Sequence, residues 1–239
     1  MIAHTYRYHS FRGLFHVYRK CRDKGYQGSY DSMCRQIRKI KLNKTKKKKR
    51  SYKKRKKKVN LVSYPGEQIQ LDVKYVPLEC IGFSSFYPRY YQITAIDVYS
   101  RKRILAIVNE KSMYTTSEFV KNLEKEMGFS ITTVQTDNGR EFCNDPEQTR
   151  LQSRFEKALK FLGIEHKRTA PYSPWQNAYV ERSHREDEEK FYQKRRFKSE
   201  EEMIKANKRY QNLGNNTYRK VLGFKSPNKV IEEYFEQVA

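Results

Sequence analysis

Three acidic residues far apart in the chain, Asp72, Asp137 and Glu181, could together hold metal ions for phosphodiester chemistry. Carboxylate oxygens suit hard divalent cations, and two such cations about 3.5 to 4 Å apart can activate a water or a 3′-hydroxyl and stabilise the leaving oxygen. Each residue alone is a weak signal, because an Asp near a strand end is most often a cap or turn residue. The chemistry therefore requires a fold that brings the three carboxylates together.

The strand that carries Asp72 is the first of three predicted in a row. Apolar residues alternate with polar ones over 69–75. This is the period of a half-buried strand, so Asp72 is expected to point away from the apolar face. Further strand-like segments at 90–98 and 103–108 are separated by a short turn, which predicts an antiparallel meander.

Asp137 and the segment before Glu181 belong to a predicted alternation of helices and strands. A helical pattern from 116 ends at 128, and a β-branched strand over 131–136 then places Asp137 at its carboxyl end. Another helix and a final strand over 164–168 follow. The predicted order βββαβαβα indicates an α/β fold with a mixed sheet.

Glu181 is predicted in the first turn of a helix. The prolines within 171–174 exclude a helix there, whereas the Pro-free stretch beyond Asn177 can be helical. Helical spacing then puts Glu181, His184 and Arg185 on one face, with a carboxylate beside basic side chains. The alternative is a solvated charged helix without a site.

A block of like charge lies between Arg38 and Lys58, where fifteen Lys and Arg occur with no acidic residue. These residues account for most of the net charge of +24. Such a block cannot pack, so it predicts a mobile arm that binds a polyanion. The 19 Tyr and 13 Phe in the chain are too many for a wholly disordered protein, and they predict a folded body.

Two short helices are predicted before the arm. Ser10 can cap one that Gly25 ends, and Ser29 can cap a second one with a basic outer face. This pair fits a helix-turn-helix that places its second helix in a DNA groove, although a helical hairpin packed on the main body is an equal alternative. At the other end of the chain, capping signals at Ser199 and Ser226 predict C-terminal helices.

The four cysteines are scattered, and neither a signal peptide nor a membrane span is visible. We therefore expect a reduced, cytoplasmic and nucleoid-associated protein. A small zinc site is less favoured, because its two cysteines would normally lie within a few residues of each other. The residues considered for it are His4, His9, His16, Cys21 and Cys34.

Four motifs occur in an order that resembles the DDE integrase core of bacterial insertion-sequence transposases, which are related to retroviral integrases. They are Gln70-Leu71-Asp72-Val73, Ala95-Ile96-Asp97 with Tyr99-Ser100-Arg101, Thr136-Asp137-Asn138-Gly139-Arg140-Glu141-Phe142, and Pro171-Tyr172-Ser173-Pro174 through Val180-Glu181-Arg182. The resemblance covers about 62–235. It implies a ribonuclease H-like fold, magnesium or manganese ions, and cutting and joining of transposon DNA ends.

By this resemblance the metal-binding catalytic triad is Asp72, Asp137 and Glu181, while Asp97 is structural. The expected parts are a helix-turn-helix-like DNA-binding segment over 1–42, a basic flexible linker over 43–61, an integrase catalytic core over 62–198 and a helical extension over 199–239. Element ends and target DNA are the expected partners, bound by a homo-oligomer, with no membrane and no small-molecule substrate. Ten basic residues are expected to contact DNA: Arg35, Arg38, Lys39, Lys47, Lys48, Arg50, Lys54, Arg55, Arg182 and Arg185.

The sequence also departs from the family pattern. The 43 residues between Asp137 and Glu181 exceed the usual spacing, and we expect the surplus around 143–153. Ala178 and Tyr179 replace a common Gly and a common DNA-contacting Lys, and the front end looks short. A catalytically silent DNA-binding protein, either a decayed or truncated copy or a regulator, is therefore the alternative. A basic RNA-binding protein would explain the arm but not the carboxylates.

Overall fold

The computed structural model describes residues 1–40, 62–145, 149, 151–170 and 173–238. The chain divides into two compact units. One combines the N-terminal segment with 216–230, and the other contains 62–215 and 231–239. The four parts expected from sequence, with their bounds, stay predictions.

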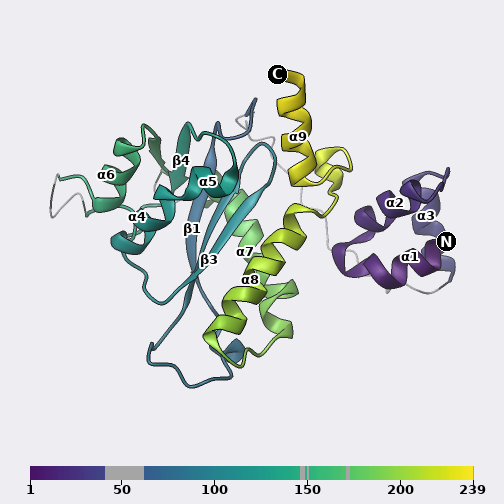
Figure 1. The fold of residues 1–239 in the computed structure, drawn as a ribbon, viewed down its shortest axis with the longest axis horizontal. Coiled ribbons are helices and arrows are strands. Elements are labelled where there is room, and N and C mark those ends of the chain that lie inside the picture. Colours follow the sequence, from purple (N-terminus) through teal and green to yellow (C-terminus); the bar gives the residue numbers. More distant parts are fainter. Residues whose placement is uncertain (41–61, 146–148, 150, 171–172, 239) are drawn as a thin grey trace. The chain divides into compact units, whose positions relative to one another are not determined.

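A five-stranded mixed sheet forms the centre of the larger unit (Figure 1). Its strands are β1 Ile69–Tyr75, β2 Tyr91–Asp97, β3 Arg103–Val108, β4 Thr133–Thr136 and β5 Glu165–Arg168. They lie in the order β3-β2-β1-β4-β5. β1, β2 and β3 pair antiparallel, while β4 pairs parallel with both β1 and β5. The predicted meander and the order βββαβαβα are confirmed.

Three helices cover the apolar face of this sheet: α4 Met113–Lys121, α5 Leu123–Met127 and α6 Arg154–Phe161. The alternating apolar residues of β1, Ile69, Leu71 and Val73, all contribute to the core beneath these helices. Val120 and Phe155 add buried side chains from α4 and α6. Removal of this apolar surface from water is the main force that assembles the layer.

The opposite face of the sheet is polar, yet it is covered by α7 Ala178–Lys190 and α8 Glu200–Asn215. Gln92 and Thr94 of β2 are fully buried on this side. Their polar atoms are satisfied by one another and by neighbouring helices, because Gln92 Nε2 donates to Thr94 Oγ1 at 2.9 Å and to Asp187 Oδ2 at 2.8 Å. The helix that carries Glu181 is therefore held by specific hydrogen bonds.

The predicted C-terminal caps are present. Ser199 accepts from the Glu202 backbone N–H at 3.1 Å at the start of α8, and Ser226 accepts from Lys229 N–H at 3.3 Å where α9 Pro227–Val238 begins. A second apolar cluster contains Tyr90, Phe191 and Met203. It contributes buried apolar contacts beyond the end of α7.

The smaller unit contains α1 Ile2–His9, α2 Leu14–Asp23 and α3 Tyr30–Lys39. The predicted Ser10 cap is wrong, because Ser10 begins a short 3-10 helix and Gly13, at φ 93°, separates it from α2. A positive φ of this kind suits glycine, and it interrupts the helical path. The predicted Ser29 cap is confirmed, since its side chain accepts from Ser32 N–H at 3.2 Å.

Most of the basic arm lies outside the described residues. Five of the predicted DNA-binding residues therefore lie outside them as well: Lys47, Lys48, Arg50, Lys54 and Arg55. Among the residues that are described, no helix is both long and apolar enough to cross a membrane.

Candidate active site

Asp72 lies in the middle of β1, on the face that α7 covers. Its Oδ1 accepts a hydrogen bond from the backbone N–H of Val73 at 2.8 Å. Burial, and next the negative charge of Asp137, raise the pKa of the Asp72 carboxyl to about 7. A carboxylate that is costly to ionise in this position is stabilised by a bound cation.

Asp137 follows the last residue of β4. In the parallel pairing, Gln70 of β1 is opposite Gln135 of β4. Asp72 lies two residues further along β1, and Asp137 two residues beyond Gln135, just past the end of β4. The two are close enough for the charge of Asp137 to affect the pKa of Asp72. Asp137 is exposed, and its Oδ1 accepts from the Gly139 backbone N–H at 2.9 Å.

Glu181 lies in the first turn of α7, as predicted, and its side chain is exposed. The start of this helix is fixed by the side chain of Gln70. Its Oε1 accepts from the backbone N–H groups of Tyr179 at 2.9 Å and Val180 at 3.3 Å, while its Nε2 donates to the Gln176 carbonyl at 2.7 Å. Gln70 thus supplies hydrogen bonds that the first turn of a helix lacks.

A second glutamine makes the same connection from the neighbouring strand. Gln135 Nε2 also donates to the Gln176 carbonyl at 2.7 Å, and its Oε1 accepts from Gln68. Each of the two aspartates is therefore preceded, two residues earlier on its strand, by a glutamine that holds α7. The sequence analysis missed this role, although the shared spacing was a usable signal.

His184 lies one turn beyond Glu181, and its Nδ1 is 3.5 Å from Asp72 Oδ2. Burial lowers the pKa of His184 to about 4, so the pair is not an ion pair at neutral pH. Within the described part of the chain, the buried Nε2 of His184 has no hydrogen-bond partner. A buried polar atom of this kind beside a carboxylate marks an incomplete site.

A buried ion pair anchors the middle of α7 to β3. Arg103 Nη1 lies 2.5 Å from Asp187 Oδ1, and it also donates to Ser183 Oγ at 2.8 Å. The Asp187 side chain is fully buried and that of Arg103 nearly so. Because either charge left alone would be costly, this pair fixes the position of the helix. Asp187 was not singled out from sequence.

Glu141 is a fourth carboxylate near the pair of aspartates, and its charge also raises the pKa of Asp72. It is buried and forms an ion pair of 2.8 Å with Lys111. A Cβ at position 139 would lie 2.6 Å from the Glu141 carboxylate. A side chain at position 139 would therefore make the Glu141 carboxylate shift.

Asp97 has its oxygens occupied by the protein. Oδ2 accepts from the Ser100 backbone N–H at 2.7 Å and hydroxyl at 2.6 Å, and Oδ1 accepts from Gly66 N–H at 3.1 Å. These bonds hold the turn between β2 and β3. These contacts support the structural role assigned to Asp97. They do not suit a metal ligand, because both carboxylate oxygens already accept hydrogen bonds from the protein.

The structure brings Asp72 and Asp137 together and places Glu181 one helical turn from the His184 that contacts Asp72. The oxygens of these three carboxylates are not all within 4.8 Å of one another. At least one of the three side chains must therefore move before all three can share one cation. The triad assignment stays a prediction.

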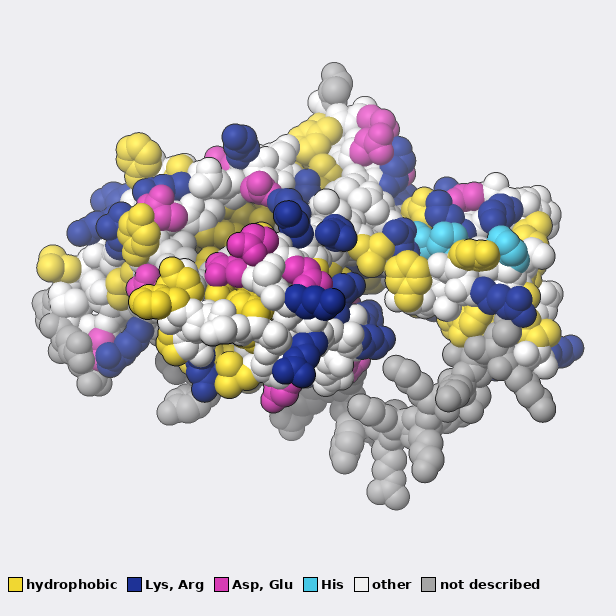
Figure 2. Space-filling view, turned by 60° about the horizontal axis from the view of Figure 1, so that its bottom comes forward, with side chains coloured by type: hydrophobic (Ala, Val, Ile, Leu, Met, Phe, Trp, Pro, Cys, Tyr) yellow, Lys and Arg dark blue, Asp and Glu magenta, His cyan; other side chains and the backbone are white. Residues whose placement is uncertain are grey.

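The predicted DNA-binding residues that the structure describes are all exposed. Arg35, Arg38 and Lys39 are on α3, and Arg182 and Arg185 are on α7. Another basic side chain lies near the start of α7, because the Arg101 guanidinium is 3.7 Å from the ring centroid of Tyr179. Figure 2 shows acidic side chains gathered among Lys and Arg on the larger unit.

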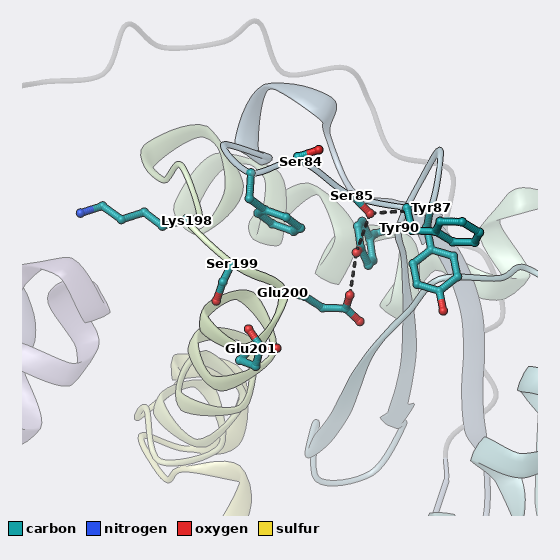
Figure 3. A pocket seen from close by; sticks show the side chains of 10 residues that line it. Ser84, Ser85, Tyr87, Tyr90, Lys198, Ser199, Glu200 and Glu201 are labelled. Atoms are coloured by element: carbon teal, nitrogen blue, oxygen red, sulfur yellow. Dashed lines mark hydrogen bonds between the residues drawn. The ribbon is translucent and has the colours of Figure 1, made fainter.

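A pocket lies between the loop at 83–90 and the start of α8 (Figure 3). Tyr90 donates to Glu200 at 2.7 Å within it. None of the residues that line this pocket is a predicted site residue. The alternative zinc set does not form a compact ligand group in the part of the chain described; the residues concerned are His4, His9, His16, Cys21 and Cys34.

Comparisons with known proteins agree with the observed fold. Two family models, each described as an integrase core domain, match residues 63–174 and 162–219. Among solved structures, the catalytic core domain of BIV integrase is similar with a TM-score of 0.50 and 18% sequence identity, over 72% of this chain and 97% of that one. No curated protein matches the sequence. The structural similarity supports the ribonuclease H-like fold.

Proposed function

Because residues 63–219 belong to the integrase core domain of DDE-type integrases and transposases, we propose that this protein is a transposase. It cleaves phosphodiesters at the ends of a mobile DNA element and joins the resulting 3′-hydroxyls to target DNA. The family acts on DNA and uses divalent metal ions. For this chain the proposed ions are Mg²⁺ or Mn²⁺.

The observation that carries the proposal is the electrostatic coupling of Asp72 to Asp137. Both are hard oxygen donors. Burial first, and then repulsion by the negative charges of Asp137 and Glu141, raises the pKa of Asp72. A divalent cation removes that repulsion, so the residues present fit such an ion. The unpartnered Nε2 of His184 indicates that this region is completed by something other than the described residues.

In this proposal Asp72, Asp137 and Glu181 would hold the metal ions. Bound there, such ions activate the attacking hydroxyl or water and stabilise the charge of the leaving oxygen. The remaining residues position these ligands. Gln70 and Gln135 hold the start of α7, and the Arg103–Asp187 pair holds its middle. The backbone that carries Glu181 is thereby fixed relative to β1 and β4, as catalysis by positioned groups requires.

The function is tested with purified full-length protein, candidate element ends and Mg²⁺, comparing wild type with Glu181→Gln. The amide keeps the size and helix propensity of Glu181 but loses the negative charge that helps hold a cation. We expect cleavage and strand transfer to disappear while DNA binding stays near the wild-type level. Strand transfer by the Gln variant at the wild-type rate would refute the assigned role. DNA binding with no cleavage by the wild type would favour the silent DNA-binding alternative.

A further inference from the structure

A second group of metal-binding side chains lies outside the carboxylate site. Cys143 follows the Asp137 turn, Glu156 is in the first turn of α6, and His166 is in β5. One sulfur, one oxygen and one nitrogen from these residues lie within 4.8 Å of one another. Cys143 is 3% exposed, so its sulfur is enclosed by the protein.

The hydrogen bonds of Thr136 show which nitrogen of His166 carries the proton. A hydroxyl has one hydrogen, and Thr136 Oγ1 donates it to the Asp137 carbonyl at 2.7 Å. In its 2.9 Å contact with His166 Nε2, Thr136 must therefore accept. His166 Nε2 carries the hydrogen, which leaves a lone pair on Nδ1 in the neutral ring.

The lone pair of Nδ1 faces another acceptor, because Glu156 Oε1 is 3.8 Å away. The other oxygen, Oε2, accepts from the Ser153 backbone N–H at 2.7 Å within a capping box. The group thus has a free imidazole nitrogen, a free carboxylate oxygen and a nearby thiol directed to one place. Both the imidazole and the carboxylate are oriented by further hydrogen bonds, as is usual for protein ligands of metals.

We propose that Cys143, Glu156 and His166 bind one transition-metal ion, of which Zn²⁺ fits best. A thiolate, an imidazole and a carboxylate are the three ligand types that zinc takes in proteins, and a water can complete four-coordination. Mg²⁺ instead prefers oxygen ligands alone. The proton of the Cys143 thiol is released to solvent when the metal–sulfur bond forms. The exposed Arg168 side chain, which interacts with the thiol, turns toward solvent.

The ion has a structural role in this position. Cys143 begins the segment 143–153 in which the sequence predicted the surplus residues before Glu181, and Glu156 lies three residues beyond its end. A metal that joins both residues to β5 closes this segment at its base. Thr136, which orients His166, directly precedes Asp137, so the metal also stabilises the strand end that presents the aspartate.

The probes are Zn²⁺ and Co²⁺ added to the purified full-length protein in excess Mg²⁺. We expect one equivalent of zinc to survive dialysis and to raise the melting temperature by several degrees. Co²⁺ should produce a thiolate-to-metal charge-transfer band, which reports a sulfur ligand directly. No retained zinc and no such band in the wild type would overturn the proposal without the use of any variant.

Variants identify the ligands. Cys143→Ser and His166→Gln should each lose the charge-transfer band or the retained zinc, whereas Thr136→Val should weaken binding by about 10 to 100-fold. Cys80→Ser is the matched control, because Cys80 is also buried but lies outside the group. Asp72→Asn should keep the zinc, which separates this site from the carboxylate site. Retention of the band by Cys143→Ser, or its loss in Cys80→Ser, contradicts the assignment.

Discussion

Replacing Asp72 by Asn should inactivate the protein and, in the absence of metal, make it more stable. Asn keeps the shape of the side chain and an oxygen that can accept from the Val73 N–H. It removes the negative charge that burial and Asp137 disfavour. The variant therefore lacks a proposed metal ligand, and its folded state no longer has the unfavourable electrostatic energy of the ionised Asp72.

The magnitude follows from the pKa. Burial and the Asp137 charge raise the pKa of Asp72 from 3.8 to about 7. The pKa of Asp72 is thus higher in the folded protein than in the unfolded chain. The protonated carboxyl therefore favours folding: this stability is fully present below pH 3.8 and is lost as pH rises through 7. At about 1.4 kcal/mol for each pKa unit, the ionised carboxylate destabilises the fold by up to about 4 kcal/mol at pH 8. The side chain is 21% exposed, so solvent screening reduces this only in part.

The assay is thermal or urea unfolding in a chelator at pH 8 and at pH 4. We expect Asp72→Asn to exceed the wild type by several degrees at pH 8 and by almost nothing at pH 4. The control is Glu181→Gln, which removes an exposed carboxylate from the same candidate site. This variant should be as inactive as Asp72→Asn, but its stability should equal that of the wild type. An Asn variant no more stable than the wild type at pH 8 would show that Asp72 carries no such penalty.

Three further variants test other parts of the molecule. Gln70→Ala should reduce strand transfer far more than DNA binding, because it frees the start of α7; an unchanged rate would show that Gln70 does not position the helix. Arg103→Met should destabilise the protein by about 3 to 5 kcal/mol in urea unfolding, since Asp187 would be buried without a partner; a near-neutral result would contradict this. Deleting 43–58 should flatten the dependence of DNA affinity on salt without changing sequence preference, as counterion release predicts; an unchanged salt slope would refute it.

Much of the fold could be predicted because its strands have strong local patterns. Alternation over Ile69–Tyr75 and the apolar run at Arg103–Val108 predicted both strands with their observed bounds. Helix limits were less accurate where a cap overrides periodicity. The helical pattern predicted from 116 starts too late, because α4 begins at Met113 directly after its Ser112 cap.

The buried polar face could not be predicted from the same patterns. Gln92, Thr94 and Arg103 have side chains that usually face solvent, and only the docking of α7 and α8 shows that they are enclosed. The acidic triad was proposed from its resemblance to a family. The residues that hold its helix, Gln70 and Gln135, depend on contacts between segments distant in the sequence, for which no local period exists.

The hydrogen bonds of Gln70 also bear on the order in which the protein folds. They join residues 106 to 110 positions apart, and the Arg103–Asp187 pair spans 84. Closure of such long loops costs more entropy than pairing the neighbouring strands of the meander. We therefore expect the three-stranded meander to form early and α7 to dock late. A nascent chain would bring Glu181 toward Asp72 and Asp137 only near the end of folding, after all five strands of the sheet have been synthesised.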